Sequence, residues 1–292
     1  RDYLLNARLS DKEINSIISF YGPNELYRSY IYSRSANWRG VPIFVKDNID
    51  TKNLANTAGS KALLDNLPKD DAQIIKNLKK AGFVIAGKTN LSEWANFRAS
   101  SSTSGWSSVG GQTYNPYNLK YNPCGSSSGS AAIVAEGIAP ASIGTETNGS
   151  IVCPASINGV VGIKPTVGLV SRDGIIPISS SQDTAGPMAR SVYDAAIVLE
   201  SISGRDPKDK ITFNIPRDYD FKGLTKLDPN YLNGKRIGVI KISDDAPEVT
   251  KNLANKIAIV LENLGAEVIE ISLKTLDSDD WSKEFYLLLY EF

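Results

Sequence analysis

The order of apolar and polar positions predicts alternating strands and helices in the first half of the chain. The run VPIFV at 41–45 is apolar throughout, which is typical of a buried strand. Residues 70–81 have apolar side chains at helical spacing, with Asp70 or Asp71 as the expected N-cap, and FVIAG at 83–87 follows as a short strand. A helix that leads directly into a strand indicates an α/β protein.

The same alternation continues through the second half of the chain. After Lys241, apolar residues recur on one side of a helix that lies between two strands, which gives a second strand–helix–strand unit. The other elements that the pattern predicts are helices within 1–38, at 131–139 and at 191–204, and strands at 141–146, 159–164, 235–241 and 266–273.

Residues 99–130 break the pattern, because they are almost all Ser, Gly, Asn, Pro and Tyr. One interpretation is a flexible linker. The other is a long structured loop with a functional role, which the Trp and Tyr residues favour and which could bring Trp106 to the wall of a pocket.

Composition excludes several classes of function. Lys+Arg and Asp+Glu both number 32, and no basic patch of the kind that binds nucleic acid is present. No apolar run approaches the roughly 18 residues of a membrane span. We therefore expect a soluble protein, either cytoplasmic or exported after removal of a leader, since the first residue is Arg1 rather than Met.

The chain has no histidine and only two cysteines, Cys124 and Cys153, which are far apart in sequence. Metal sites built on His and Cys are therefore not expected, and no cofactor is predicted. Two buried free thiols are the default interpretation of the cysteines, and a single disulfide is the alternative.

Ser150 follows Asn-Gly in the segment GTETNGS, where small residues expose a hydroxyl that can act as a nucleophile. Without histidine, the proton acceptor must be a carboxylate, a tyrosinate or a lysine, and a lysine can serve only if it is buried and therefore neutral. Lys46 ends the apolar run VPIFVK and meets that requirement. The alternative is that Lys46 is a cation at a strand end, paired with Asp47 or Asp50.

A second serine-rich segment, CGSSSGS at 124–130, precedes the expected helix at 131–139. It could bind an anion through its backbone N–H groups, or one of its hydroxyls could relay a proton between a buried lysine and the nucleophile. The segment has neither a GK[ST] ending nor a GxGxxG pattern, so nucleotide binding is the weaker alternative.

Several segments, taken in order, resemble the amidase signature family: FVKDNID, CGSSSGSAA, GTETNGS and PASINGVVGIKPT. The resemblance extends from about Trp38 to Leu273. LSEWANFR, SGWSSVGGQTYNPY and SRDGIIPISSSQDTAGPMARS are similar to the peptide amidase branch, whose members remove the C-terminal amide of peptides.

The resemblance implies a Ser-Ser-Lys triad. Lys46 matches the general base, Ser126 the bridging serine after a cis peptide bond, and Ser150 the nucleophile. The backbone N–H groups implied for the oxyanion hole are those of Thr147, Asn148, Gly149 and Ser150. Glu146 stands where many members have Asp, and Asp183 is expected to fix a loop near the site.

The resemblance also implies the fold: a mixed β-sheet covered by helices on both faces, in one domain over 1–292. The catalytic core is expected at about 38–204, and 205–292 is a further portion of sheet and helix. The family's chains continue beyond the point that matches the amphipathic helix expected at 281–292, so we expect the C-terminal part of the fold to be missing.

The expected function is hydrolysis of a carboxamide through an acyl-enzyme, with a peptide amide or a small-molecule amide as the substrate. Two alternatives are retained. One is a non-catalytic or incomplete amidase-like subunit. The other is the glutamine-amidase subunit of a tRNA-dependent amidotransferase, which would need a protein partner. The sequence does not predict an oligomeric state.

Overall fold

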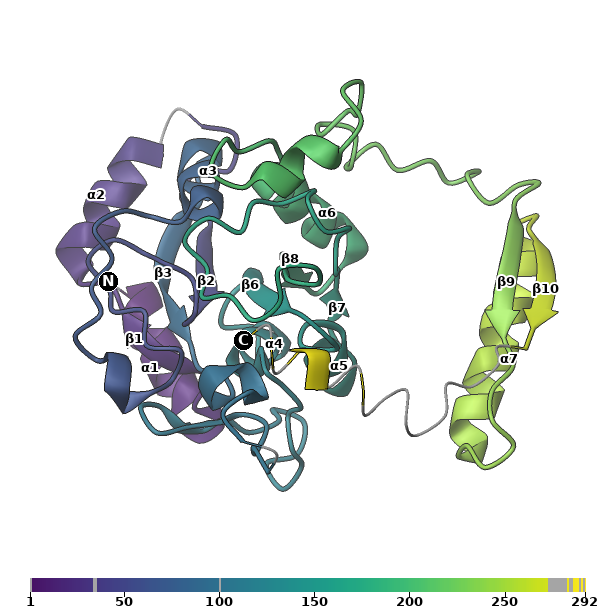
Figure 1. The fold of residues 1–292 in the computed structure, drawn as a ribbon, viewed down its shortest axis with the longest axis horizontal. Helices are drawn as coiled ribbons and strands as arrows, with labels where there is room; N and C mark the ends of the chain where they lie inside the picture. The colour runs from purple at the N-terminus through teal and green to yellow at the C-terminus, as the bar shows by residue number, and fades with distance from the viewer. Residues whose placement is uncertain are drawn as a thin grey trace. The chain divides into compact units, whose positions relative to one another are not determined.

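The computed structural model describes residues 2–33, 36–99, 101–272, 283, 286–288, 290 and 292 (Figure 1). The chain divides into two compact units, Arg1–Thr225 with Leu288–Phe292, and Lys226–Leu287. All the predicted site residues lie in the first unit, and the single domain over 1–292 stays a prediction. Within the described part of the chain, no helix is both long and apolar enough to cross a membrane.

The first unit is built on a six-stranded mixed sheet with the order β1-β3-β2-β6-β8-β7. β2 runs parallel to β3 and to β6, whereas β1 pairs with β3, and β8 pairs with β6 and β7, in antiparallel fashion. This confirms the predicted mixed sheet. The strands are β1 (Ile17–Phe20), β2 (Pro42–Lys46), β3 (Val84–Thr89), β6 (Ala141–Glu146), β7 (Val161–Gly162) and β8 (Thr184–Ala189).

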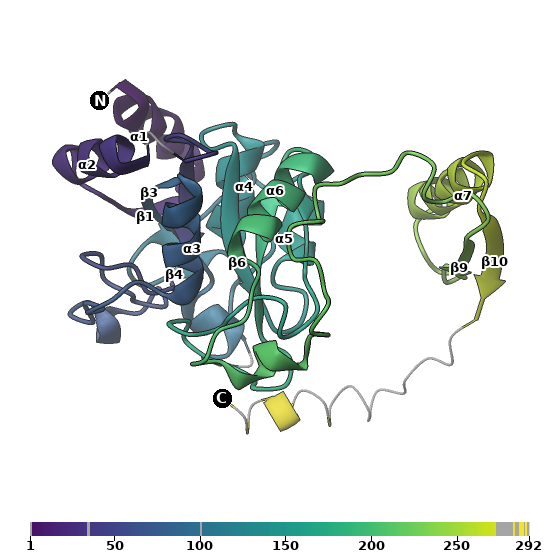
Figure 2. The ribbon, with the colours of Figure 1, turned by 90° about the horizontal axis from the view of Figure 1, so that it is seen from above.

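Helices cover both faces of this sheet, as the views in Figures 1 and 2 show. One face packs against α3 and α6 through an apolar cluster, and the other packs against α1 and α4 through a second cluster. The helices of the unit are α1 (Asp2–Ile14), α2 (Pro23–Ser33), α3 (Gln73–Ala81), α4 (Ser128–Ala135), α5 (Val152–Ile157) and α6 (Val192–Ile202), with short 3-10 turns at Lys61–Leu63, Glu93–Asn96 and Lys210–Asn214.

The alternation of side chains along β2 positions the predicted base. Ile43 and Val45 pack into the cluster with α3 and α6, and Phe44 packs into the cluster with α4. Because successive strand residues point to opposite faces, Lys46 shares the face of Phe44. That is the face where the loop with Ser126 leads into α4.

Most predicted elements are present, with differences at their ends. The cap of α3 is Ala72 rather than Asp70 or Asp71, and the helix ends at Gly82 in the left-handed conformation (φ 105°). Asp71 instead accepts a hydrogen bond from the Lys52 N–H and pairs with a lysine of α3. β1 interrupts the segment 1–38 that was expected to be helical.

β8 was not predicted, although it lies in the middle of the sheet. Its sequence, TAGPMA, contains Gly186 and Pro187, and proline lacks the N–H that a central strand normally donates. The carbonyl of Pro187 still accepts a hydrogen bond from the Ile163 N–H. α5 was also not predicted, because six residues are too few to show a helical period.

Residues 101–130 are packed against the first unit and contain the two-stranded pair β4 (Trp106–Ser107) and β5 (Gly111–Gln112). The buried amide of Asn90 donates to Gly111 O and to Thr113 Oγ1, and Ser107 Oγ donates to Asn90. This network agrees with the structured loop and not with the linker interpretation.

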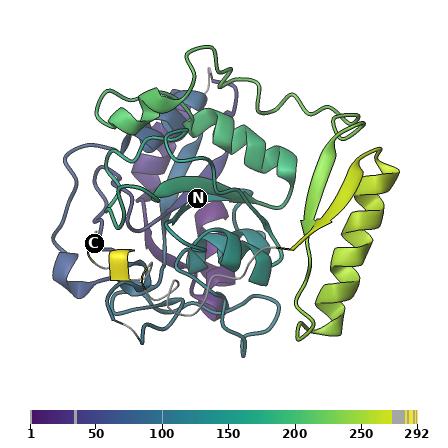
Figure 3. The ribbon, with the colours of Figure 1, turned by 45° about the vertical axis from the view of Figure 1, so that its right-hand side comes forward.

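The described part of the second unit contains one strand–helix–strand motif, as predicted. β9 (Arg236–Ile240) and β10 (Glu267–Ile271) are parallel neighbours in register, and α7 (Glu248–Asn263) connects them. Figure 3 shows α7 running alongside the two strands. Most of the helix expected at 281–292 lies outside the described residues.

We expect Leu78→Ala to lower the free energy of unfolding by about 2–5 kcal/mol, because the side chain of Leu78 is fully buried between α3 and the sheet. The matched control is Leu67→Ala, since Leu67 is 63% exposed and should change stability by less than about 0.5 kcal/mol. Urea unfolding measures both. Equal effects of the two substitutions would contradict the described core.

Candidate active site

Lys46 ends β2 inside the first unit, with no exposed surface. Its Nζ donates to Ser126 Oγ at 2.7 Å, and it also contacts both oxygens of Thr145. Burial lowers the pKa of Lys46 to about 7, because the charged form loses its hydration, while the negative charges of Asp183 and Glu146 act in the opposite direction. Near neutral pH, a large fraction of this amine is therefore uncharged.

The alternative interpretation of Lys46, as a cation paired with Asp47 or Asp50, is wrong. Asp47 forms a buried ion pair with Lys88, whose Nζ lies 3.1 Å from the Asp47 carboxylate. Asp50 accepts a hydrogen bond from the Asn56 amide instead. The carboxylate that follows Lys46 in sequence is thus already neutralised by another lysine.

Ser126 lies in the loop before α4 and is fully buried. The peptide bond between Gly125 and Ser126 is cis, which confirms the expectation from the family resemblance. The carbonyl of Ser126 accepts a hydrogen bond from the Ser92 N–H, so the loop is anchored through its backbone as well as through its hydroxyl. The hydroxyl is thereby held against Lys46.

Ser150 lies in the turn between β6 and α5, 8% exposed. Its carbonyl accepts a hydrogen bond from the Ser127 N–H, which brings the two serine segments next to each other. Its hydroxyl has no hydrogen-bond partner among the described residues. The hydrogen bond between Lys46 and Ser126 is thus formed in this structure, whereas no hydrogen bond joins the hydroxyls of Ser126 and Ser150.

The turn before Ser150 presents free backbone donors. The N–H groups of Thr147, Asn148 and Ser150 have no acceptor within the described part of the chain, so they are available to an oxyanion. The fourth predicted donor, the Gly149 N–H, donates to Glu146 Oε1 at 2.9 Å.

Glu146 is a residue whose role the sequence did not reveal. Its carboxylate is 4% exposed and accepts hydrogen bonds from Gly149, Ile151 and Val152 N–H, the last two at the start of α5. A negative charge at a helix N-terminus is favourable, and here it also fixes the turn around the nucleophile. The sequence signal that could have indicated this role is the position of Glu146, four residues before Ser150 and six before the first residue of α5.

Lys164, in the GIKPT segment, compensates the charge of Glu146. Its Nζ lies 3.6 Å from Glu146 Oε1 and donates to the Thr147 carbonyl at 2.6 Å. The carbonyl bond orients the peptide between Thr147 and Asn148, one of the peptides that carries a free donor. Unlike Lys46, Lys164 is partly exposed.

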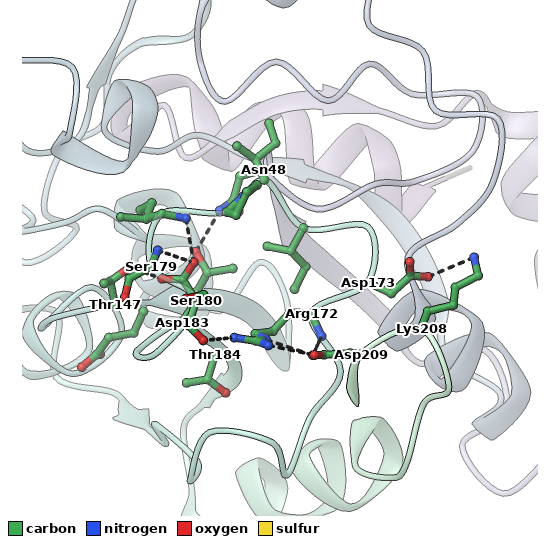
Figure 4. Close-up of a pocket in the computed structure, with 16 residues that line it drawn as sticks. Asn48, Thr147, Arg172, Asp173, Ser179, Ser180, Asp183, Thr184, Lys208 and Asp209 are labelled. Atoms are coloured by element: carbon green, nitrogen blue, oxygen red, sulfur yellow. Dashed lines mark hydrogen bonds and ion pairs between the residues drawn. The ribbon is translucent and has the colours of Figure 1, made fainter. Parts of the chain in front are cut away.

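A cavity of about 300 Å³ adjoins this turn (Figure 4). Thr145, Glu146 and Thr147 form one part of its wall, and the apolar residues Ile175, Ile176, Pro177 and Ile178 form another. The lining does not include Lys46, Ser126 or Ser150, and Lys46 is connected to it through its contact with Thr145. The cavity is therefore next to the predicted triad and not centred on it.

Asp183 fixes the loop that bounds the cavity, as expected. Its carboxylate accepts hydrogen bonds from Thr147 Oγ1 and from the Ile178 and Ser179 N–H groups. On the far wall, Arg172 donates to both carboxylate oxygens of Asp209, as the dashed lines in Figure 4 mark. Asp183 is thus held by hydrogen bonds from neutral donors, whereas Arg172 and Asp209 form an ion pair.

The two cysteines are not free thiols. Cys124 and Cys153 form a disulfide with a Cα–Cα distance of 6.0 Å, so the default interpretation of the sequence is wrong and the alternative holds. The bond was not apparent from the spacing of 29 residues, because only the fold brings the loop with Cys124 next to α5. It connects the loop before Ser126 to the helix that follows Ser150.

Comparisons with known proteins agree with this geometry. A family model described as Amidase matches residues 1–291. An Arabidopsis thaliana protein named "Probable amidase" is 47% identical over 244 residues, which are 82% of this chain and 48% of that protein. The chain thus spans about half the length of this relative.

Two solved structures allow a closer comparison. The native peptide amidase of Stenotrophomonas maltophilia has a TM-score of 0.91 and 48% identity, over 99% of this chain and 61% of that one. One component of the glutamyl-tRNA(Gln) amidotransferase of Thermotoga maritima has a TM-score of 0.74 and 30% identity, over 97% of this chain and 66% of that one. Since the family model spans nearly the whole sequence and the fold agrees, the chain belongs to the amidase signature family.

Proposed function

We propose that this protein hydrolyses carboxamides, and that its substrates are peptides with a C-terminal amide, from which it releases ammonia. The observation that carries the proposal is the buried Lys46, 2.7 Å from Ser126, with a pKa lowered to about 7. Such an amine can accept a proton near neutral pH without histidine. No cofactor takes part in the proposed reaction.

The proposed reaction begins with proton transfer along the three side chains. Ser150 attacks the carbonyl carbon of the amide and gives its proton to Ser126, which gives its own to the neutral Lys46. The negative charge on the carbonyl oxygen is stabilised by the free N–H groups of Thr147, Asn148 and Ser150. One such donor is typically worth about 3 kcal/mol in the transition state.

The attack gives a tetrahedral intermediate, and its breakdown to the acyl-enzyme completes the first half of the reaction. The C–N bond breaks, the proton returns along Lys46 and Ser126 to the leaving nitrogen, and ammonia departs. Water then gives a proton to the same relay and attacks the acyl-enzyme, which regenerates Ser150 and releases the carboxylic acid. The reaction needs no oxidant, reductant or other reactant besides the amide and water.

The likeness to the peptide amidase supports the substrate class. The similarity to that structure exceeds the similarity to the amidotransferase component in both TM-score and identity. The cavity next to Thr147 has an apolar wall, and Arg172 and Asp209 in its lining form an ion pair, which suits the uncharged acyl part of a peptide amide. The second candidate, a glutamine-amidase subunit, is supported by the likeness to the amidotransferase component of Thermotoga maritima.

We expect Ser150→Ala to reduce ammonia release from a peptide amide by at least about a thousandfold, because the nucleophile is lost. The matched control is Ser156→Ala on the exposed side of α5, which should keep the parent rate. A fluorophosphonate probe should label Ser150 in the parent protein, as mass spectrometry can show. Labelling at another serine would overturn the nucleophile.

The same ammonia assay distinguishes between the two candidate functions. A peptide amidase should release ammonia from a peptide amide much faster than from free glutamine. The reverse preference would support the glutamine-amidase candidate. A parent protein that is labelled at Ser150 but turns over neither substrate would indicate an incomplete amidase-like chain.

We expect the rate to rise with pH through a midpoint near 7 and then level off, because only the neutral form of Lys46 accepts a proton. Asp183→Asn should move this midpoint to lower pH, since removing a nearby negative charge favours the neutral amine. The measurement is kcat/KM against pH for both proteins. A midpoint that moved upward, or did not move, would contradict the assignment of Lys46 as the base.

A further inference from the structure

Three oxygens surround the amine of Lys46, and two of them belong to one residue at the end of β6. Nζ lies 2.7 Å from Ser126 Oγ, 2.9 Å from Thr145 Oγ1 and 3.2 Å from the Thr145 carbonyl oxygen. Lys46 and Ser126 are fully buried and Thr145 is nearly so, hence water does not compete for these positions. Two of the three hydrogen-bond partners of the Lys46 amine are therefore oxygens of Thr145.

The hydrogen atoms available to these contacts restrict how the bonds can run. A neutral amine has two N–H bonds and one lone pair, so it can donate twice and accept once. The Thr145 carbonyl can only accept, and it takes one N–H. For Lys46 to act as a base, the Ser126 hydroxyl must donate to the lone pair. The second N–H then goes to Thr145 Oγ1.

The surroundings of Thr145 hold both of its oxygens in place. Asn48 Nδ2 donates to Thr145 Oγ1 at 3.0 Å, a contact that Figure 4 marks at the Asn48 side chain. Ser127 Oγ donates to the Thr145 carbonyl at 3.0 Å, and the Thr145 N–H donates back to Ser127 Oγ. Both oxygens of Thr145 are thus fixed toward Nζ from two sides.

We propose that Thr145 is a positioning residue for Lys46, with Asn48 as its support: it accepts both N–H groups of the neutral amine and thereby turns the lone pair toward Ser126. The inference rests on the proposed function, since it assigns a role within the same proton relay. After Ser126 has given its proton to Lys46, the three N–H bonds of the ammonium meet the same three oxygens. The proton transfer therefore requires no movement of side chains around Nζ.

Charged groups around Lys46 affect its pKa and therefore the pH at which the relay becomes active. Asp183 and Glu146 favour the protonated form of the amine. Glu146 is itself paired with Lys164, and Asp47, which follows β2, forms an ion pair with Lys88 of β3. Substitution of Thr145 leaves all of these charges in place. A change in the pH midpoint in such a variant therefore comes from the lost hydrogen bond.

The test is the rate of fluorophosphonate labelling at Ser150 as a function of pH, which needs no amide substrate. Thr145→Val keeps the shape of the side chain but removes Oγ1. We expect its labelling above the midpoint to be about tenfold to a hundredfold slower, because the lone pair is no longer directed. The midpoint should also move to lower pH, because the ammonium loses an acceptor. Thr145→Ser restores the hydroxyl and should recover most of the rate.

Two results would overturn the inference. One is labelling of Thr145→Val at the parent rate with the parent midpoint. The other is a Thr145→Ser variant as slow as Thr145→Val, which would assign the effect to the lost methyl packing. If Thr145→Val does not fold, Asn48→Ala carries the test: a slower rate with a shifted midpoint supports the inference, and an unchanged profile overturns it. A parent protein that is not labelled at Ser150 would instead overturn the proposed function.

Discussion

An amine without access to water is the constraint on which the rest of the site depends. An ammonium ion loses most of its hydration when it is buried, so the interior favours the neutral form of Lys46 and makes it a base. The strand that holds it lies in the middle of the sheet between two parallel neighbours, with helices on both faces. The chemistry of the site therefore requires the complete packing of the first unit and not only the local loop.

The carboxylates near this amine are each occupied by other donors. Asp47 is paired with Lys88, Glu146 accepts three backbone N–H groups, and Asp183 accepts two backbone N–H groups and a hydroxyl. None forms an ion pair with Lys46 among the described residues. A direct ion pair would stabilise the ammonium form and raise the pKa of Lys46, so that little neutral amine would be left near pH 7 to accept a proton. The partners of these acids therefore matter as much as the lysine itself.

The sequence predicted the chemical groups better than their surroundings. Lys46 and Ser150 could be singled out from the composition of their segments, whereas the role of Ser126 came from the family resemblance. β2 and β6 could be predicted as buried core strands, and α3 because its apolar residues recur at helical spacing. The roles of Glu146 and Thr145 could not be predicted, since they depend on turn geometry and on contacts between β2 and β6. β8 was missed because Pro187 argues against a central strand. The disulfide was missed because the loop with Cys124 meets α5 only in the folded chain.

The Cys124–Cys153 bond has a consequence for how the protein can tolerate such a site. A buried lysine and a cysteine in the left-handed conformation at φ 58° both count against the folded state. A cross-link between residues 29 positions apart restricts the unfolded chain, and in the chain-entropy view this favours folding by roughly 3–4 kcal/mol. That contribution does not depend on how favourable the native contacts are. The cross-link therefore offsets part of the cost of the buried amine whatever the quality of the packing around the two serines.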